Sequence, residues 1–194
     1  FLAGCASNQP AIAPATSTQA APQQTNDESK FKLCESESFM ALHMARNYML
    51  ISKRDKSAVL NYISRDDKYA NAVAEEIFSG VDSGRIRHYA DYAADRLFKC
   101  SQEQGMPITK SQDLLRMCFA RVDIPFLLSA FKDQGLAKSE AINRATTALK
   151  DERQYPKPLI TAVASQMYAP GQQASADRHM KQLFWSCTFS QEWS

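Results

Sequence analysis

The chain has 194 residues, 44% hydrophobic and 23% charged, which is typical of globular proteins and sufficient for one domain or two small ones. The formal net charge of +2 lacks the strong positive field that drives nucleic-acid binding, so we expect no nucleic-acid partner. No apolar run reaches the ~18 residues of a transmembrane helix, so we expect any membrane attachment to be covalent or peripheral.

The first residues contain the short motif Leu2-Ala3-Gly4-Cys5. This motif resembles the lipobox of bacterial lipoproteins, and the resemblance covers only these residues. It implies that residues 1–4 are the remnant of a signal peptide, because the small Ala3 and Gly4 suit a signal-peptidase site. It also implies that Cys5 carries acyl chains such as palmitate, which anchor the protein to a membrane at about 0.8 kcal/mol for each buried methylene.

Residues 6–30 contain mainly Ala, Gln, Pro, Thr, Ser and Asn. Such a segment buries too little apolar surface to order itself, so we expect residues 5–30 to be the lipidated cysteine and a flexible linker. A chance motif is disfavoured, because it stands at the start of the chain directly before this linker. Ala6 and Ser7 follow the cysteine in place of the Asp that retains enterobacterial lipoproteins at the inner membrane. The resemblance therefore implies an outer-membrane protein that faces the periplasm.

An internal duplication is predicted after the linker. Four further cysteines, Cys34, Cys100, Cys118 and Cys187, define two intervals of nearly equal length. Three pairs of segments match in order between these intervals: 56–59 with 138–141, 72–78 with 162–168, and 97–100 with 184–187. We therefore predict a first helical unit over residues 31–105 and a second over residues 106–194.

Apolar residues at helical spacing predict an all-α fold with four helices in each unit, and no segment alternates like a strand. In the first unit the helices cover about residues 40–51, 55–63, 70–80 and 86–100, with Asp55 as an N-cap. In the second unit, capping and helix-breaking residues indicate the boundaries. They are a capping box at Thr109-Lys110-Ser111-Gln112, a kink at Pro125, a stop at Gly135, Pro156 and Pro158 before the third helix, and Ser175 before the fourth.

The helix order also predicts the disulfides. In an up-down-up-down bundle, the start of the first helix and the end of the fourth lie at the same end. Of the three pairings that four cysteines allow, we therefore expect Cys34–Cys100 and Cys118–Cys187. Each would stabilise its unit by roughly 4 kcal/mol in the chain-entropy model. Reduced core cysteines are the alternative, which the lipobox and the even number of cysteines besides Cys5 disfavour.

Catalytic and metal-binding patterns are missing from the sequence. The histidines His43, His88 and His179 are scattered, so we interpret them as surface or cap residues rather than metal ligands. There is no nucleophile elbow and no glycine-rich phosphate loop. Adjacent acids such as Glu75 and Glu76 point about 100° apart on a helix and could not flank a reacting bond together. We therefore expect no catalytic residue, no metal, no cofactor and no enzymatic activity.

Two kinds of surface are candidates for binding. Basic residues gather at 53–56 and 85–88, which we interpret as solvated surfaces of mixed charge. Phe98 and Trp185 stand beside the closing cysteine of each unit and are expected to pack in the core. Phe189 and Trp193 lie beyond the second unit's last cysteine, and they become candidate binding residues for a protein partner if they are exposed.

These features favour a membrane-anchored envelope lipoprotein that acts as a non-enzymatic protein-interaction or assembly module. Its partners would be the membrane, through the lipid on Cys5, and an envelope protein. The alternative is a periplasmic helical carrier or sensor of a small apolar ligand, held between helices. In that alternative, Met40, Met44 and Met49 would line a pliable pocket.

Overall fold

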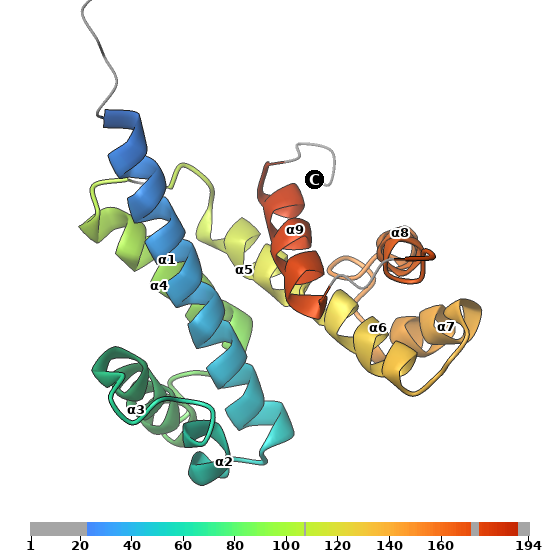
Figure 1. The fold of residues 1–194 in the computed structure, drawn as a ribbon, viewed down its shortest axis with the longest axis horizontal. Helices are drawn as coiled ribbons and strands as arrows, with labels where there is room; N and C mark the ends of the chain where they lie inside the picture. Colours follow the sequence, from blue (N-terminus) through green and yellow to red (C-terminus); the bar gives the residue numbers. More distant parts are fainter. Residues whose placement is uncertain (1–22, 107, 172–174, 190–194) are drawn as a thin grey trace, which may run out of the picture.

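The computed structural model describes residues 23–106, 108–171 and 175–189, and the regular secondary structure in these ranges is entirely helical (Figure 1). The first half contains α1 (Gln23–Arg46), the π-helix η1 (Asn47–Ile51), α2 (Lys56–Leu60), α3 (Lys68–Asp82) and α4 (Tyr89–Glu103). The second half contains α5 (Gln112–Ala120), α6 (Asp123–Asp133), α7 (Lys138–Ala148), α8 (Lys157–Met167) and α9 (Ala176–Phe189). None of the described helices is long and apolar enough to cross a membrane.

Helix α1 begins earlier than the sequence analysis predicted. It starts at Gln23, so residues 23–30, which were expected to belong to the flexible linker, are helical. These residues lack apolar side chains of their own, but they continue directly into the amphipathic part of α1. The Lys30 ammonium also donates a hydrogen bond to the carbonyl of Gln104 at 3.4 Å, which ties this turn to the end of α4.

In the first half, α1 packs along α4, and α3 lies against the C-terminal end of α1 (Figure 1). The predicted N-cap Asp55 is confirmed, since its carboxylate accepts hydrogen bonds from the amides of Ser57 and Ala58. Helix α3 continues two residues past the predicted stop at Gly80 and ends at Asp82. There the Asp82 carboxylate accepts a hydrogen bond from the Tyr48 hydroxyl at 3.0 Å, which links α3 to η1.

The first helix of the second half is broken rather than kinked. Helix α5 ends at Ala120 and α6 begins at Asp123, so the break precedes Pro125. Pro125 instead occupies the first turn of α6, where its missing N–H leaves no helical hydrogen bond unmade. The N-cap of α5 is Ser111, whose hydroxyl accepts a hydrogen bond from the amide of Leu114 at 3.2 Å. The predicted capping box starting at Thr109 is therefore wrong.

The remaining boundaries of the second half largely follow the local signals. Gly135 has a φ of +78° just after the end of α6, as expected of a helix stop. Ser175 precedes α9, and its hydroxyl accepts a hydrogen bond from the amide of Arg178. Pro156 caps α8, but Pro158 lies inside its first turn rather than before it.

Both predicted disulfides are present. Cys34 of α1 is bonded to Cys100 of α4, and Cys118 of α5 is bonded to Cys187 of α9, with Cα–Cα distances of 5.5 and 5.6 Å. Each bond joins the first helix of one half to the last helix of the same half. The two crosslinks therefore lie within the halves, and the halves are held together by other contacts.

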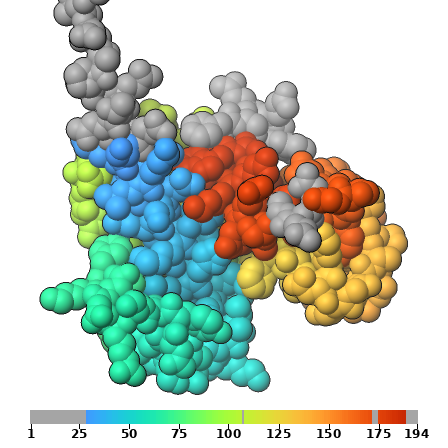
Figure 2. All heavy atoms as spheres, viewed as in Figure 1, coloured from blue at the N-terminus to red at the C-terminus, as the bar shows by residue number. Residues whose placement is uncertain are grey.

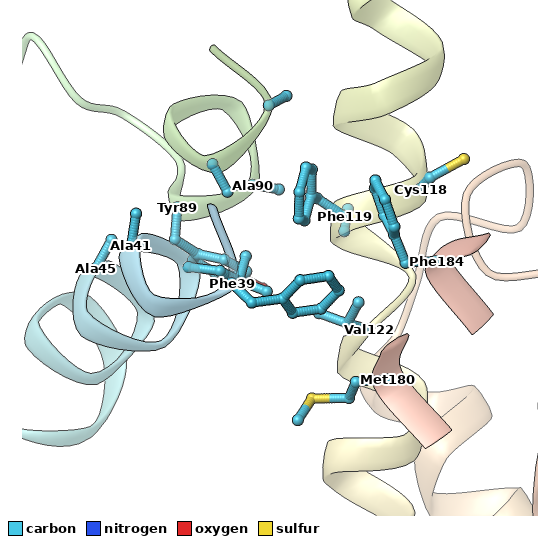
Figure 3. Packing of buried hydrophobic residues seen from close by; sticks show 14 of the residues in the cluster. Phe39, Ala41, Ala45, Tyr89, Ala90, Cys118, Phe119, Val122, Met180 and Phe184 are labelled. Atoms are coloured by element: carbon cyan, nitrogen blue, oxygen red, sulfur yellow. The ribbon is translucent and has the colours of Figure 1, made fainter. Parts of the chain in front are cut away.

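The two halves share one buried apolar cluster. Phe39 of α1 meets Phe119 of α5 and Phe184 of α9, with ring centroids 5.5 Å apart in both cases (Figure 3). Phe119 and Phe184 are themselves 4.2 Å apart. In Figure 2 the side chains of α1 lie against those of α9 and α6. The halves therefore form one packed body.

Candidate functional site

A buried acid lies at the boundary between the two halves. Asp123, in the first turn of α6, is 7% exposed. Arg46 at the end of α1 donates from its Nε to the Asp123 Oδ1 at 3.0 Å. The hydroxyls of Tyr89, at the start of α4, and Tyr155, before α8, both donate to the Asp123 Oδ2. The Asp123 carboxylate therefore connects α6 to the end of α1, to the start of α4 and to the segment before α8.

The environment of this carboxylate favours a fixed structure over proton transfer. Burial, and then the neighbouring Asp123 charge, raises the pKa of both Tyr89 and Tyr155 well above the usual value. Both phenols therefore stay protonated and act as donors. The Arg46 guanidinium is 8% exposed and lies 3.4 Å from the centroid of the Phe126 ring, a cation–π arrangement. These contacts hold α1 and α4 against α6.

A groove with a mostly charged lining runs along α4 beside this buried group. It consists of two adjoining hollows of about 370 and 460 Å³ that share His88, Asp91 and Arg116. The His88 ring stacks on Tyr89 at a centroid distance of 4.3 Å, so the groove borders the Asp123 group directly. Its charged residues are Arg85, Arg87, Arg96, Lys99, Arg116 and Arg153, together with Glu76, Asp91, Asp95 and Asp151. We call this surface the charged groove.

Most acids of the charged groove are already engaged. Arg116 pairs with Asp95 at 3.0 Å, and Arg96 pairs with Glu76 at 3.0 Å. In contrast, three arginines of the lining have no carboxylate within ion-pair distance in the described part of the chain. They are Arg85, Arg87 and Arg153. The groove therefore presents uncompensated positive charge, which suits an acidic ligand.

Arg96 is held in place by two phenols at the edge of the groove. It donates to the hydroxyl of Tyr92 at 3.3 Å and to that of Tyr69 at 2.7 Å. Burial raises the pKa of each tyrosine to about 12. Both phenols are therefore neutral at physiological pH, and among the described residues Glu76 is the carboxylate that balances the Arg96 charge.

The three histidines have different environments and do not form a common site. His88 is the N-cap of α4, its Nδ1 accepting from the amide of Ala90 at 3.2 Å. His43 is partly exposed, with its Nε2 3.7 Å from the Asp177 carboxylate. His179 is buried, at 6% exposure, which corrects the expectation of a surface or cap residue. Among the described residues, no group of three or more His, Cys, Asp or Glu could hold a metal ion.

The binding residues suggested by the sequence are only partly visible. Cys5 and Trp193 lie outside the described residues, as does the side chain of Phe189 at the end of α9. Trp185 is partly buried between α9 and α1, where its Nε1 donates to the Glu35 carboxylate at 2.8 Å. Phe98 also packs partly buried against the core. Neither aromatic beside a disulfide therefore forms an open patch.

The methionines of the first helix and the basic segments also have defined places. Met40, Met44 and Met49 are partly buried and pack against the core. Residues 53–55 form an exposed turn between η1 and α2, in which Lys53 and Arg54 have positive φ angles of 50° and 67°, and Lys56 begins α2. Residues 85–88, the second basic segment, line the charged groove.

The buried charges were not predicted, although the sequence contains a signal for them. Between Met117 and Leu128 the chain is apolar except for Arg121 and Asp123. Charged residues inside an apolar run are buried with it, and a buried charge requires a partner. What the sequence does not identify is that partner, since Arg46 lies in a distant helix.

Comparisons with protein-family models, curated proteins and solved structures found no match. The function is therefore inferred from the residues of this chain.

Proposed function

We propose that this chain is a membrane-anchored lipoprotein of the bacterial cell envelope and that its helical body is a non-enzymatic module that binds an envelope protein. The Leu2-Ala3-Gly4-Cys5 motif supports the anchor, with acyl chains on Cys5. The two disulfides support an oxidising compartment such as the periplasm. The absence of an Asp after Cys5 supports the outer membrane as the site of attachment.

The charged groove is the observation that carries the binding function. It is open and elongated, so it suits an extended polypeptide segment better than an enclosed small molecule. Its arginines Arg85, Arg87 and Arg153, which have no carboxylate within ion-pair distance among the described residues, would pair with acidic side chains of that segment. The segment would lie on a rigid support, because α4 is fixed to α6 through the Asp123 group. The partner is therefore an envelope protein with an acidic segment.

The fold of this module is a tandem of two four-helix units that arose by duplication. In support, each half begins with a helical stretch, which in the second half is divided into α5 and α6, and continues with three further helices. In this alignment α5 and α6 together correspond to α1. A cysteine of the first helix is joined to one of the fourth in both halves. The matched segments 72–78 and 162–168 fall on α3 and on α8 with its C-cap Tyr168, the third helix of each unit.

Site-specific photocrosslinking in the bacterium tests the partner. A photoreactive amino acid replaces Arg87, which is exposed in the charged groove, or Thr147, which is exposed on α7 away from it. We expect one dominant protein adduct from position 87 and none of that size from position 147. Charge reversal by Arg85→Glu and Arg153→Glu should abolish the adduct. The same adducts from both positions, or an adduct that survives charge reversal, would refute binding in the groove.

The anchor is tested separately. Cells are labelled with an alkyne analogue of palmitate, and the chain is followed in membrane and soluble fractions. We expect label and membrane association in the natural chain and neither in Cys5→Ser, while Ser7→Cys in the Cys5→Ser background should restore neither. Membrane association of the unlabelled Cys5→Ser chain would show that the lipid is not the anchor.

A further inference from the structure

A second, smaller pocket lies between α8 and α9. Its volume is about 200 Å³, and its walls combine apolar side chains, Leu159, Val163 and Leu183, with the polar side chains of Arg121 and His179. No acidic residue lines it in the described part of the chain. An apolar pocket with a few converging polar groups is the usual form of a small-molecule site.

Arg121 is a buried cation without a counter-charge among the described residues. It is 3% exposed, and its Nε donates to the carbonyl of Gln154 at 3.0 Å, while its Nη1 lies 3.4 Å from the sulfur of Cys187. Neither acceptor is charged, and no carboxylate reaches this guanidinium among the described residues. Its Nη2 donates no hydrogen bond to the described protein. A buried charge left in this way is costly, and proteins normally pair it.

His179 adds a second unused polar group to the same pocket. It is 6% exposed, and its Nε2 has no hydrogen-bond partner in the described part of the protein. Burial lowers the pKa of His179, and the nearby charges of Arg178 and Lys132 lower it further. The ring is therefore neutral at physiological pH, and an Nε2–H tautomer can donate one hydrogen bond. The surrounding cations also give the pocket a positive potential.

The first half of the chain lacks this arrangement. Three residues after the first cysteine of each disulfide stand Glu37 in the first half and Arg121 in the second. Eight residues before the second cysteine stand Tyr92 and His179. The first half therefore folds and forms its disulfide without an arginine and a histidine at these positions. Packing of such a half alone does not explain why the second half has Arg121 and His179 there.

We propose that the pocket between α8 and α9 binds a small monocarboxylic acid with a short apolar chain. The carboxylate accepts hydrogen bonds from the Arg121 guanidinium and supplies the missing negative charge. The His179 ring lines the same pocket and therefore lies beside the bound acid. The apolar chain contacts Leu159, Val163 and Leu183. The volume corresponds to roughly seven water molecules, which is the size of pentanoate.

This site is separate from the charged groove, which is lined by α4, α5 and the segment before α8, because the two share no lining residue. It gives the carrier alternative a specific place in the second half. It also changes the expected ligand from a wholly apolar molecule to an apolar acid, since a neutral hydrocarbon would leave the Arg121 charge unpaired.

Titration of the Cys5→Ser chain with pentanoate, followed by NMR, tests the proposal. The probe is sodium pentanoate at pH 7, and its neutral analogue pentanamide is the control ligand. We expect pentanoate to shift the ring signals of His179 and the amides around Leu159 and Leu183. Pentanamide should bind at least about tenfold more weakly, because it lacks the charge that makes such hydrogen bonds strong.

Two variants place the binding in the pocket. Arg121→Met removes the cation and should weaken pentanoate binding at least about tenfold. Ala162→Trp fills the mouth of the pocket from an exposed position on α8, leaves Arg121 in place, and should abolish binding. The matched control is Ala72→Trp, at the corresponding exposed position of α3, which should bind pentanoate like the parent chain.

Three results would overturn the site. The first is equal binding of pentanoate and pentanamide, which would remove the role of the charge. The second is unchanged binding in Ala162→Trp, which decides the matter even if Arg121→Met does not fold. The third is the absence of any pentanoate-dependent shift at His179 up to millimolar concentrations.

Discussion

Asparagine in place of Asp123 keeps the size of the side chain and removes its charge. Arg46 then remains buried with no counter-ion, and the Asn amide group faces hydroxyls that need an acceptor. Removing one partner of a buried ion pair typically costs about 3–5 kcal/mol. A domain of this size has a free energy of unfolding of about 5–15 kcal/mol, so Asp123→Asn should remove a large part of it.

An exposed ion pair provides a matched control. Arg116 and Asp95 also meet at 3.0 Å, but their side chains are 36% and 51% exposed, against 9% and 10% for Arg46 and Asp123. Exposed pairs contribute about 0–1 kcal/mol. Asp95→Asn should therefore cost roughly 2–5 kcal/mol less than Asp123→Asn, with burial as the principal difference between them.

Guanidinium denaturation of the Cys5→Ser chain with intact disulfides, followed by circular dichroism, measures both costs. Similar slopes with denaturant are required before the free energies of unfolding are compared. The double variant Arg46→Met, Asp123→Leu removes both charges, and it should be more stable than Asp123→Asn because no lone charge stays buried. Equal costs for Asp123→Asn and Asp95→Asn, within about 0.5 kcal/mol, would refute the proposal that the Asp123 group joins the two halves.

Three further predictions concern stability. Replacing both cysteines of either disulfide by alanine should lower the free energy of unfolding by roughly 4 kcal/mol. The two losses should be similar, because the bonds close loops of 66 and 69 residues. Chemical denaturation of the two variants measures both losses, and a large difference between them would contradict this prediction. The lowered pKa of His179 means that, as pH falls below 6.5, the unfolded state takes up its proton first and stability declines. The loss of stability between pH 7.5 and 5.5 should therefore be smaller in His179→Gln, and an equal loss would contradict the assignment. Lys53→Gly relieves a positive φ of 50° and should stabilise the chain by about 0.5–1 kcal/mol, whereas Lys99→Gly inside α4 should destabilise it by about 1 kcal/mol; thermal melts that moved in the same direction would contradict this.

The sequence was most informative where the structure depends on local chemistry. Asp55, Gly135 and Ser175 act within one helical turn, so their roles could be predicted from neighbouring residues. The disulfides were also predictable, because their pairing follows from the order of the helices. The N-terminal turns of α1 were not, since their composition matches a linker and their tie to Gln104 spans 74 residues.

The candidate sites were less predictable because they depend on distant contacts. Asp123 meets Arg46 across 77 residues of sequence, and nothing near either residue indicates the other. The charged groove combines α4 with α5 and the segment before α8. Its net charge therefore cannot be predicted from any one segment of the sequence. Residues 85–88 were interpreted as a surface of mixed charge, and only the fold shows which of their neighbours are already paired.

Arg46 and Arg121 are both buried arginines, and the same substitution should affect them in opposite ways. Arg46→Met leaves the buried Asp123 charge alone and should cost about 3–5 kcal/mol. Arg121→Met removes a charge that has no counter-ion among the described residues, and it loses only two hydrogen bonds to uncharged acceptors. Without a bound acid, Arg121→Met should therefore be at least as stable as the parent chain.

Chemical denaturation of both variants, with and without pentanoate, distinguishes a structural from a binding role for Arg121. A structural role predicts a loss of stability like that of Arg46→Met and no effect of pentanoate on either chain. A binding role predicts that pentanoate stabilises the parent chain, because a ligand raises the stability of the state that binds it, and leaves Arg121→Met unchanged. Replacing an arginine that serves packing lowers the stability of the ligand-free protein. Replacing one that serves a ligand lowers stability only when the ligand is present.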